Sequence, residues 1–170
     1  HCGLVGSEMC IRDRLREVFC APVKTRTIDV QGCSISFLEW GETTAPSLIF
    51  LHGRMSHARC WGAVAPLVAQ DWHCIAVDFS GMGDSGWRDT YTYQHRMAEV
   101  RKIIDECELV NPILVTHSYG AVIGVRLASE APQSYSGLIA CDPSLAHPDQ
   151  WAAQTPRDTP AFLERPHKVR

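Results

Sequence analysis

The sequence predicts an α/β domain in which a mostly parallel sheet is covered by helices on both faces. Strand-sized apolar runs alternate with helix-sized segments from about residue 24 onward, which is typical of right-handed βαβ units. The run SLIFL at 47–51 is continuously apolar, as parallel strands buried on both faces are. The 170 residues are 45% hydrophobic and 21% charged, ordinary values for one globular domain with its own core.

The strands are expected at 25–32, 33–41, 47–52, 73–80, 112–118 and 135–142. The first two are β-rich with Gly32 between them, and we expect them to pair antiparallel at an edge of the sheet. The continuous apolar strands that follow are expected to pair in parallel. In such a sheet, functional groups collect where the strands end, here at 52–56, 78–86, 116–120 and 142–147.

Helices are expected at 58–70, 93–110 and 121–131. The first helix has one predicted apolar face, made by Trp61, Val64, Leu67 and Val68. Pro66 should kink this helix or move its start, because proline lacks the amide hydrogen. The helix at 93–110 places charges opposite an apolar face that comprises Met97, Val100, Ile104 and Cys107.

The two ends of the chain are read separately from this core, which we place at 15–146. Residues 4–14, LVGSEMCIRDR, resemble a translated sequencing adapter, so residues 1–14 are interpreted as an artefactual leader. From Ser144 the periodicity stops, and four prolines lie between 147 and 170.

Charge and cysteine content limit the possible partners. The net charge of −3 predicts no binding to nucleic acid or to an anionic membrane, and no apolar run approaches the length of a membrane span. Six cysteines outside the leader are scattered without a C-x-x-C pair. We interpret them as small buried residues of a reducing compartment, which predicts a soluble cytoplasmic protein.

The segment Thr116-His117-Ser118-Tyr119-Gly120 stands between a predicted strand and a predicted helix. It resembles the nucleophile elbow, G-x-S-x-G, of the α/β-hydrolase superfamily. The resemblance makes Ser118 the candidate catalytic nucleophile, exposed on a tight turn at the positive end of a helix. Thr116 replaces the first glycine of the pattern, and it is accommodated if Gly124 leaves room.

His52, Gly53 and Arg54 follow the strand at 47–52. In the same superfamily a His-Gly pair at this place opens the oxyanion-hole loop. The resemblance therefore implies that the backbone N–H groups of Arg54 and Tyr119 form the oxyanion hole. Two other readings are that His52 is merely a polar turn residue, or that it binds a metal with His57, for which no third ligand lies nearby.

The loop DFSGMGDSG at 78–86 resembles the D-x-R-G-x-G-x-S loop of the superfamily, with Ser80 in place of the arginine. The resemblance implies that one ion pair of that loop is missing here. Gly81, Gly83 and Gly86 also match G-x-G-x-x-G, a pattern of dinucleotide sites. That alternative lacks a helix directly after the glycines and an acidic residue after a following strand.

A serine hydrolase needs a histidine and an acid after Ser118, and the superfamily supplies both from later strands. We expect them beyond Arg170, so that the chain is truncated before the last strands of the fold. Asp142 with His147 is a variant arrangement, whereas His167 lies between prolines. Residues 147–170 are expected to begin a cap or lid region, in which Trp151 and Phe162 line a substrate pocket or simply pack.

The resemblance implies a serine hydrolase that cleaves an ester or related acyl bond of a small molecule through an acyl-enzyme, without a cofactor or metal. Carbon–carbon bond hydrolysis and perhydrolysis use the same serine and stay open. Dehalogenases and epoxide hydrolases of this fold carry aspartate at the elbow, so serine argues against both. A non-catalytic binding or scaffold protein of the same fold is the alternative from another class. We also expect the 170-residue chain to aggregate or to need a partner segment, because its last strand leaves an open apolar edge.

Overall fold

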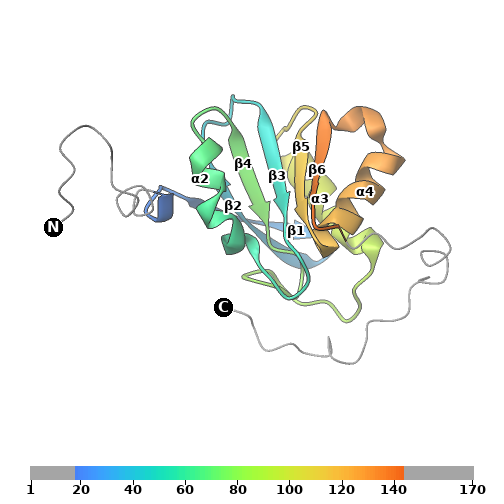
Figure 1. The fold of residues 1–170 in the computed structure, drawn as a ribbon. Coiled ribbons are helices and arrows are strands. Elements are labelled where there is room, and N and C mark those ends of the chain that lie inside the picture. Colours follow the sequence, from blue (N-terminus) through green and yellow to red (C-terminus); the bar gives the residue numbers. More distant parts are fainter. Residues whose placement is uncertain (1–17, 144–170) are drawn as a thin grey trace, which may run out of the picture.

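A computed structural model of the chain describes residues 18–143, which form one mixed sheet with helices on both of its faces (Figure 1). The sheet has six strands in the order β1-β2-β4-β3-β5-β6. This confirms the predicted α/β class. The strands are β1 (Lys24–Val30), β2 (Cys33–Trp40), β3 (Ser47–Leu51), β4 (His73–Val77), β5 (Ile113–His117) and β6 (Gly137–Cys141).

The strands pair as their composition predicts. β1 and β2 form an antiparallel hairpin, whose two-residue turn places Gln31 and Gly32 at positive φ, as tight hairpin turns require. β2 also pairs antiparallel with β4, whereas β3 pairs in parallel with both β4 and β5, and β5 with β6. The four parallel strands therefore end at one edge of the sheet.

Two separate hydrophobic clusters cover the two faces of the sheet. On one face, α3 (Tyr93–Glu106) and α4 (Tyr119–Glu130) contribute side chains such as Met97 and Leu127. On the other face, a 3-10 helix, η1 (Ala58–Ala63), and the short α2 (Ala65–Val68) contribute Trp61 and Ala65. Figure 1 shows α2 and α4 on opposite sides of the sheet. A buried parallel sheet needs both layers, because each strand presents apolar side chains to both faces.

The prediction of one helix at 58–70 is wrong in the length of the helix and in the residues that form its buried face. Pro66 lies in the first turn of α2, where a missing N–H costs nothing, and the preceding residues form η1 instead of a continuous α-helix. The break changes which side chains face the sheet. Trp61 is buried as expected, but Val64 and Leu67 are exposed.

The helix predicted at 93–110 is α3, and its N-terminus is capped by the Thr92 side chain, which accepts a hydrogen bond from the His95 N–H. Met97 and Val100 are buried as expected, Ile104 and Cys107 are partly buried against the same cluster, and Ile103 is buried as well. The expectation that all charges lie opposite that face is wrong, because Arg96 and Glu99 are also buried. Both belong to a buried ion-pair network.

All six cysteines of the described region are free thiols. Cys33 and Cys74 are buried, and Cys107 is half-buried, but Cys20, Cys60 and Cys141 are exposed. The expectation of uniformly buried cysteines is therefore wrong. Cys141 lies in β6, which is an edge strand, so its position in a strand does not bury it. Within residues 18–143 no helix is long and apolar enough to cross a membrane. The predicted leader and cap region lie outside the described residues.

Candidate active site

Ser118 lies on the sharp turn between β5 and α4. Its backbone has φ 51° and ψ −113°, a conformation that non-glycine residues adopt at a cost and that persists only where the surroundings enforce it. Two hydrogen bonds fix the turn. The Ser118 N–H donates to the Cys141 carbonyl of β6 at 3.0 Å, and the Ser118 carbonyl accepts from the Ala121 N–H at 3.0 Å. The strained turn presents the Ser118 side chain at the carboxyl edge of the sheet.

Two glycines of α4 allow this helix to lie directly against the sheet. A Cβ on Gly120 would clash with the carbonyl oxygens of Leu51 and His52. A Cβ on Gly124 would lie 2.8 Å from Cγ2 of Thr116. The room that Thr116 needs in place of the family's glycine is therefore provided by Gly124, as predicted. The Thr116 hydroxyl also donates a hydrogen bond of 3.0 Å to the Ile139 carbonyl.

The oxyanion-hole candidates lie beside Ser118. A Cβ on Gly53 would approach Cβ of Ser118 to 3.3 Å, so the loop after β3 lies close to the candidate nucleophile. Arg54 is exposed, and its guanidinium carbon lies 5.4 Å from the centre of the Tyr119 ring. Within residues 18–143, neither the Arg54 N–H nor the Tyr119 N–H donates a hydrogen bond to a protein atom. Among the described residues, both N–H groups are therefore available to a bound substrate.

His52 is fully buried and serves as a structural clasp rather than as a turn residue. The Phe79 N–H donates to Nε2 of His52 at 3.2 Å, so the ring proton is on Nδ1, which donates to the Gly53 carbonyl at 2.7 Å. Burial lowers the pKa of His52 to about 4, so the ring is neutral. The clasp joins the loops after β3 and β4. In the described part of the chain, no group of three potential metal ligands includes His52 or His57.

The glycine loop at 78–86 packs against the protein's own groups. The Asp78 carboxylate accepts hydrogen bonds from the N–H groups of Ala58 at 2.6 Å and Asp84 at 3.0 Å, and burial raises its pKa. A Cβ on Gly83 would clash with that carboxylate. The next helix begins only at Tyr93, so no helix N-terminus follows the glycines to bind a phosphate. The geometry does not support the dinucleotide alternative.

The ion pair expected to be missing at Ser80 is replaced from elsewhere in the chain. Arg96 of α3 donates to the Ser80 carbonyl at 2.6 Å and to its hydroxyl at 2.7 Å. Arg88 donates to the same hydroxyl at 3.2 Å and pairs with Glu99 at 3.2 Å. Sequence reasoning missed this network. The only signal was the charged pair at 96 and 99, which lies on the apolar face of its helix.

The acid and base of a triad are not assembled in the described region. Within residues 18–143 the Ser118 hydroxyl forms no hydrogen bond to a histidine or a carboxylate. Asp142 follows β6 at φ 46° and is exposed, but its proposed partner His147 lies outside the described residues, as do His167, Trp151 and Phe162. The expectation of an acid and a histidine beyond Arg170 stays a prediction.

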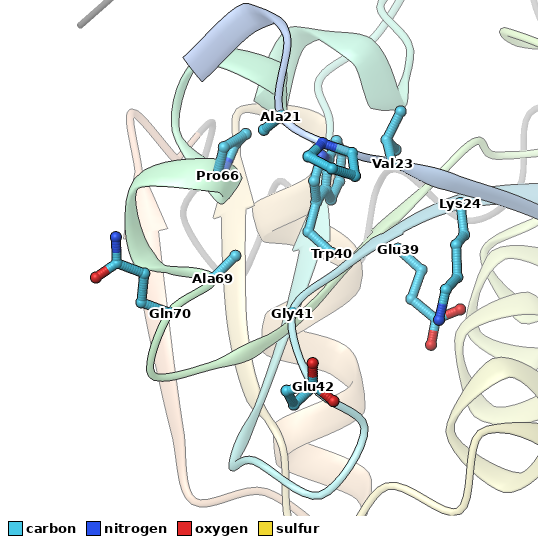
Figure 2. Close-up of a pocket in the computed structure, with 11 residues that line it drawn as sticks. Ala21, Val23, Lys24, Glu39, Trp40, Gly41, Glu42, Pro66, Ala69 and Gln70 are labelled. Atoms are coloured by element: carbon cyan, nitrogen blue, oxygen red, sulfur yellow. The ribbon is translucent and has the colours of Figure 1, made fainter. Parts of the chain in front are cut away.

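A cavity of about 370 Å³ lies at the opposite end of the sheet (Figure 2). Its walls include Trp40 and Glu39 of β2 and Pro66 of α2. Trp40 pairs with Cys74 at the start of β4, so the cavity adjoins the amino ends of the parallel strands, whereas Ser118 follows the carboxyl end of β5. This cavity does not open onto Ser118 and is not its substrate pocket.

Comparison with known proteins places this arrangement in a family. The chain is 31% identical over 117 residues to a haloalkane dehalogenase of Bradyrhizobium diazoefficiens, covering 68% of this chain and 38% of the relative. It is 34% identical over 115 residues to an esterase of Mycobacterium tuberculosis, covering 66% and 38%. A solved thioesterase domain from the curacin biosynthetic pathway matches with a TM-score of 0.68 and 26% identity, covering 78% of this chain and 51% of that one.

The chain thus spans less than two fifths of the length of these two curated relatives. A family model described as the alpha/beta hydrolase family matches residues 48–169. That range contains the elbow, the loop after β3 and the glycine loop. The six-stranded sheet, the strained serine turn and this match agree, and the chain belongs to the alpha/beta hydrolase family.

Proposed function

We propose that this protein is a serine hydrolase that cleaves an ester or a related acyl bond through an acyl-enzyme on Ser118. The conformation of Ser118 is the observation that carries this proposal. Ser118, at φ 51°, is the residue directly before α4, and the positive end of a helix favours developing negative charge, which supports this role. The esterase and the thioesterase domain among the similar proteins support acyl transfer as the reaction class.

The proposed reaction has two steps. The Ser118 hydroxyl oxygen attacks the substrate carbonyl carbon while its proton passes to a histidine, which we place outside residues 18–143. The carbonyl oxygen becomes an oxyanion that accepts hydrogen bonds from the N–H groups of Arg54 and Tyr119, and the alcohol leaves with the proton. Water then attacks the acyl-enzyme by the same route and releases the acid and the free serine.

The dehalogenase relative shares sequence with the chain, but its named reaction does not fit this elbow. Displacement of a halide by a carboxylate yields an alkyl ester that water can hydrolyse. The hydroxyl of Ser118 would instead form an ether, which water does not cleave under mild conditions. The residue at the elbow therefore favours acyl chemistry over dehalogenation.

The test uses the protein as its gene encodes it, assayed with short p-nitrophenyl esters. We expect Ser118→Ala to reduce kcat by several orders of magnitude, and we expect a fluorophosphonate probe to label the parent but not this variant. Ser129→Ala removes an exposed serine from the same helix and should retain both activity and labelling. Hydrolysis by Ser118→Ala at the parental rate would refute the nucleophile, and an unlabelled, inactive parent would favour a binding protein.

A further inference from the structure

We infer that the Arg54 side chain is a specificity-determining group that binds a carboxylate or similar anionic group of the substrate. The inference rests on the proposed serine hydrolase and deepens it, because it assigns the substrate class. Only the backbone N–H of Arg54 takes part in the proposed oxyanion hole. Its guanidinium is a separate functional group, and three features of its surroundings indicate what it does.

The first feature is the position of the guanidinium. Arg54 follows the Gly53 that contacts Ser118, and its guanidinium carbon lies 5.4 Å from the centre of the Tyr119 ring, within the range of a cation–π contact. Tyr119 is the residue directly after Ser118. A positive charge is thus held against the immediate neighbour of the nucleophile.

The second feature is that the aromatic surface beneath Arg54 is itself fixed. The Tyr119 ring stacks on Tyr93 with centres 6.1 Å apart and 28° between planes, and it meets Phe79 edge-on at 6.3 Å. Burial raises the pKa of the Tyr119 hydroxyl, which therefore stays neutral and does not neutralise the arginine. The ring orients the guanidinium at little entropic cost and leaves its charge available.

The third feature is the distribution of carboxylates at this edge of the sheet. Asp78 accepts two backbone N–H groups, Asp84 pairs with Arg59 at 2.8 Å, and Glu99 pairs with buried arginines. Within residues 18–143, no carboxylate lies within 4.0 Å of the Arg54 guanidinium nitrogens. Asp142 follows β6, whereas Arg54 lies in the loop after β3, and β5 separates these two strands in the sheet.

An exposed guanidinium that has no counter-ion within residues 18–143 and lies beside the proposed nucleophile favours substrates that carry a negative charge. Arginine offers two parallel N–H donors that match a carboxylate. The carboxylate lies either on the acyl chain or on the leaving alcohol, and the two cases share one chemistry. In both, the ion pair places the scissile carbonyl near Ser118 before reaction, which contributes to kcat/KM for acidic esters.

The test compares matched acidic and neutral esters with the gene-encoded protein. For the acyl side, the pair is 4-nitrophenyl hydrogen glutarate and 4-nitrophenyl pentanoate. For the alcohol side, the pair is 3-butyryloxybenzoate and phenyl butyrate. The measured quantity is the ratio of kcat/KM for the acidic ester to that for the neutral ester. In Arg54→Met, which keeps the backbone N–H, we expect this ratio to fall about tenfold for one pair.

Three further variants complete the series. Arg54→Lys keeps the charge and should retain most of the ratio, whereas Arg54→Glu should lower it below that of Arg54→Met. Arg101→Met removes a partly exposed arginine of α3 that pairs with Glu130, and it should leave the ratio unchanged. High salt should also lower the parental ratio by screening. A fall of less than about threefold for both pairs in Arg54→Met would overturn the inference.

A binding measurement separates failure of this inference from failure of the proposed function. Glutarate is titrated calorimetrically into the Ser118→Ala protein and into the Ser118→Ala, Arg54→Met double variant. Binding that is lost in the double variant supports the anion site even if the parent hydrolyses no ester, in which case only the proposed reaction fails. Equal binding by both proteins, or none by either, would overturn the anion site.

Discussion

At the scale of single residues, a network of buried charged groups forms hydrogen bonds to the glycine loop at 78–86. Glu99 is fully buried, and it holds Arg88 and Arg96, which both donate to Ser80. A buried charge is tolerated only when partners and hydrogen bonds compensate for its lost hydration. The sequence signalled that an arginine was absent at position 80. It did not reveal that two arginines later in the chain donate hydrogen bonds to Ser80.

This network predicts that replacing glutamate by glutamine lowers the free energy of unfolding much more at position 99 than at position 130. Glu99→Gln leaves two buried guanidinium groups without their carboxylate, and we expect it to lower the free energy of unfolding by about 3 kcal/mol or more. Glu130→Gln breaks the exposed pair with Arg101, which should change it by less than about 1 kcal/mol. Urea denaturation measures both. Equal losses in the two variants would contradict the network's structural role.

His52 predicts how stability depends on pH. Its pKa in the fold is about 4, below the ordinary value near 6.5, so the folded state binds the proton less readily than the unfolded state. Its contribution to stability is complete above pH 6.5 and is lost as the pH falls toward 4. Between pH 7.5 and 5.0 we expect a loss of about 2 kcal/mol from this residue.

The measurement compares the parent with His52→Gln by urea denaturation at the two pH values. The stability difference between parent and variant should shrink by about 2 kcal/mol at pH 5.0. His57→Gln is the matched control, and it should retain the acid-dependent loss of the parent. If the difference in free energy of unfolding between the parent and His52→Gln were the same at both pH values, the expected protonation of His52 on unfolding would be refuted.

At the scale of elements, the packing of α4 against β5 fixes the turn that carries Ser118, the candidate nucleophile. The motif predicted a strand, a turn and a helix around Ser118, and it named Gly124 as the source of room for Thr116. Both expectations are confirmed, because they depend on residues close together in sequence. The first helix was harder to predict. Periodicity favoured one face over 58–70, but Pro66 starts α2 anew, and the two pieces bury different residues.

The close approach of α4 to β5 predicts that a larger residue at position 124 lowers the stability of the fold. In Gly124→Ala, the new methyl group lies 2.8 Å from Cγ2 of Thr116, so we expect a loss of about 1–2 kcal/mol of stability despite the better helix propensity of alanine. In a Thr116→Ser background, which lacks that methyl group, Gly124→Ala should cost much less. Thermal unfolding of the double-mutant cycle tests this. Gly62→Ala, where a Cβ meets nothing within 4 Å, is the control, and additive effects in the cycle would refute the contact.

At the scale of the whole molecule, the edges of the sheet are unequal. β1 lies at one edge, where its hairpin partner β2 joins it to the parallel strands. β6 lies at the other edge, and its last three residues, Ile139–Cys141, are exposed. An exposed apolar edge strand is a template for pairing with another chain. We therefore expect the aggregation predicted from the sequence to involve β6.

A substitution at Ile139 tests whether the chain self-associates through β6. We expect the 170-residue chain to self-associate through β6, and we expect Ile139→Lys to reduce that association, because a charge at the edge opposes pairing. Val110→Lys places the same charge at a more exposed valine outside the sheet and should have little effect. Sedimentation velocity reports the association. Loss of self-association in both variants, or in neither, would place the contact elsewhere.

The α/β class, the order of the strands along the chain and the position of the candidate nucleophile could all be predicted from the amino-acid sequence alone. These follow from local signals: apolar runs of strand length, a glycine at a hairpin turn, and a five-residue motif between a strand and a helix. The contacts between distant groups became visible in the folded structure. It placed the guanidinium of Arg54 on the ring of Tyr119, clasped His52 between two loops, and buried Glu99 with two arginines. Most of those contacts join segments that lie far apart in the sequence, so no local pattern records them. His52 and Glu99 are buried with their partners, and hydrogen bonds of buried polar groups gain strength where packing excludes water.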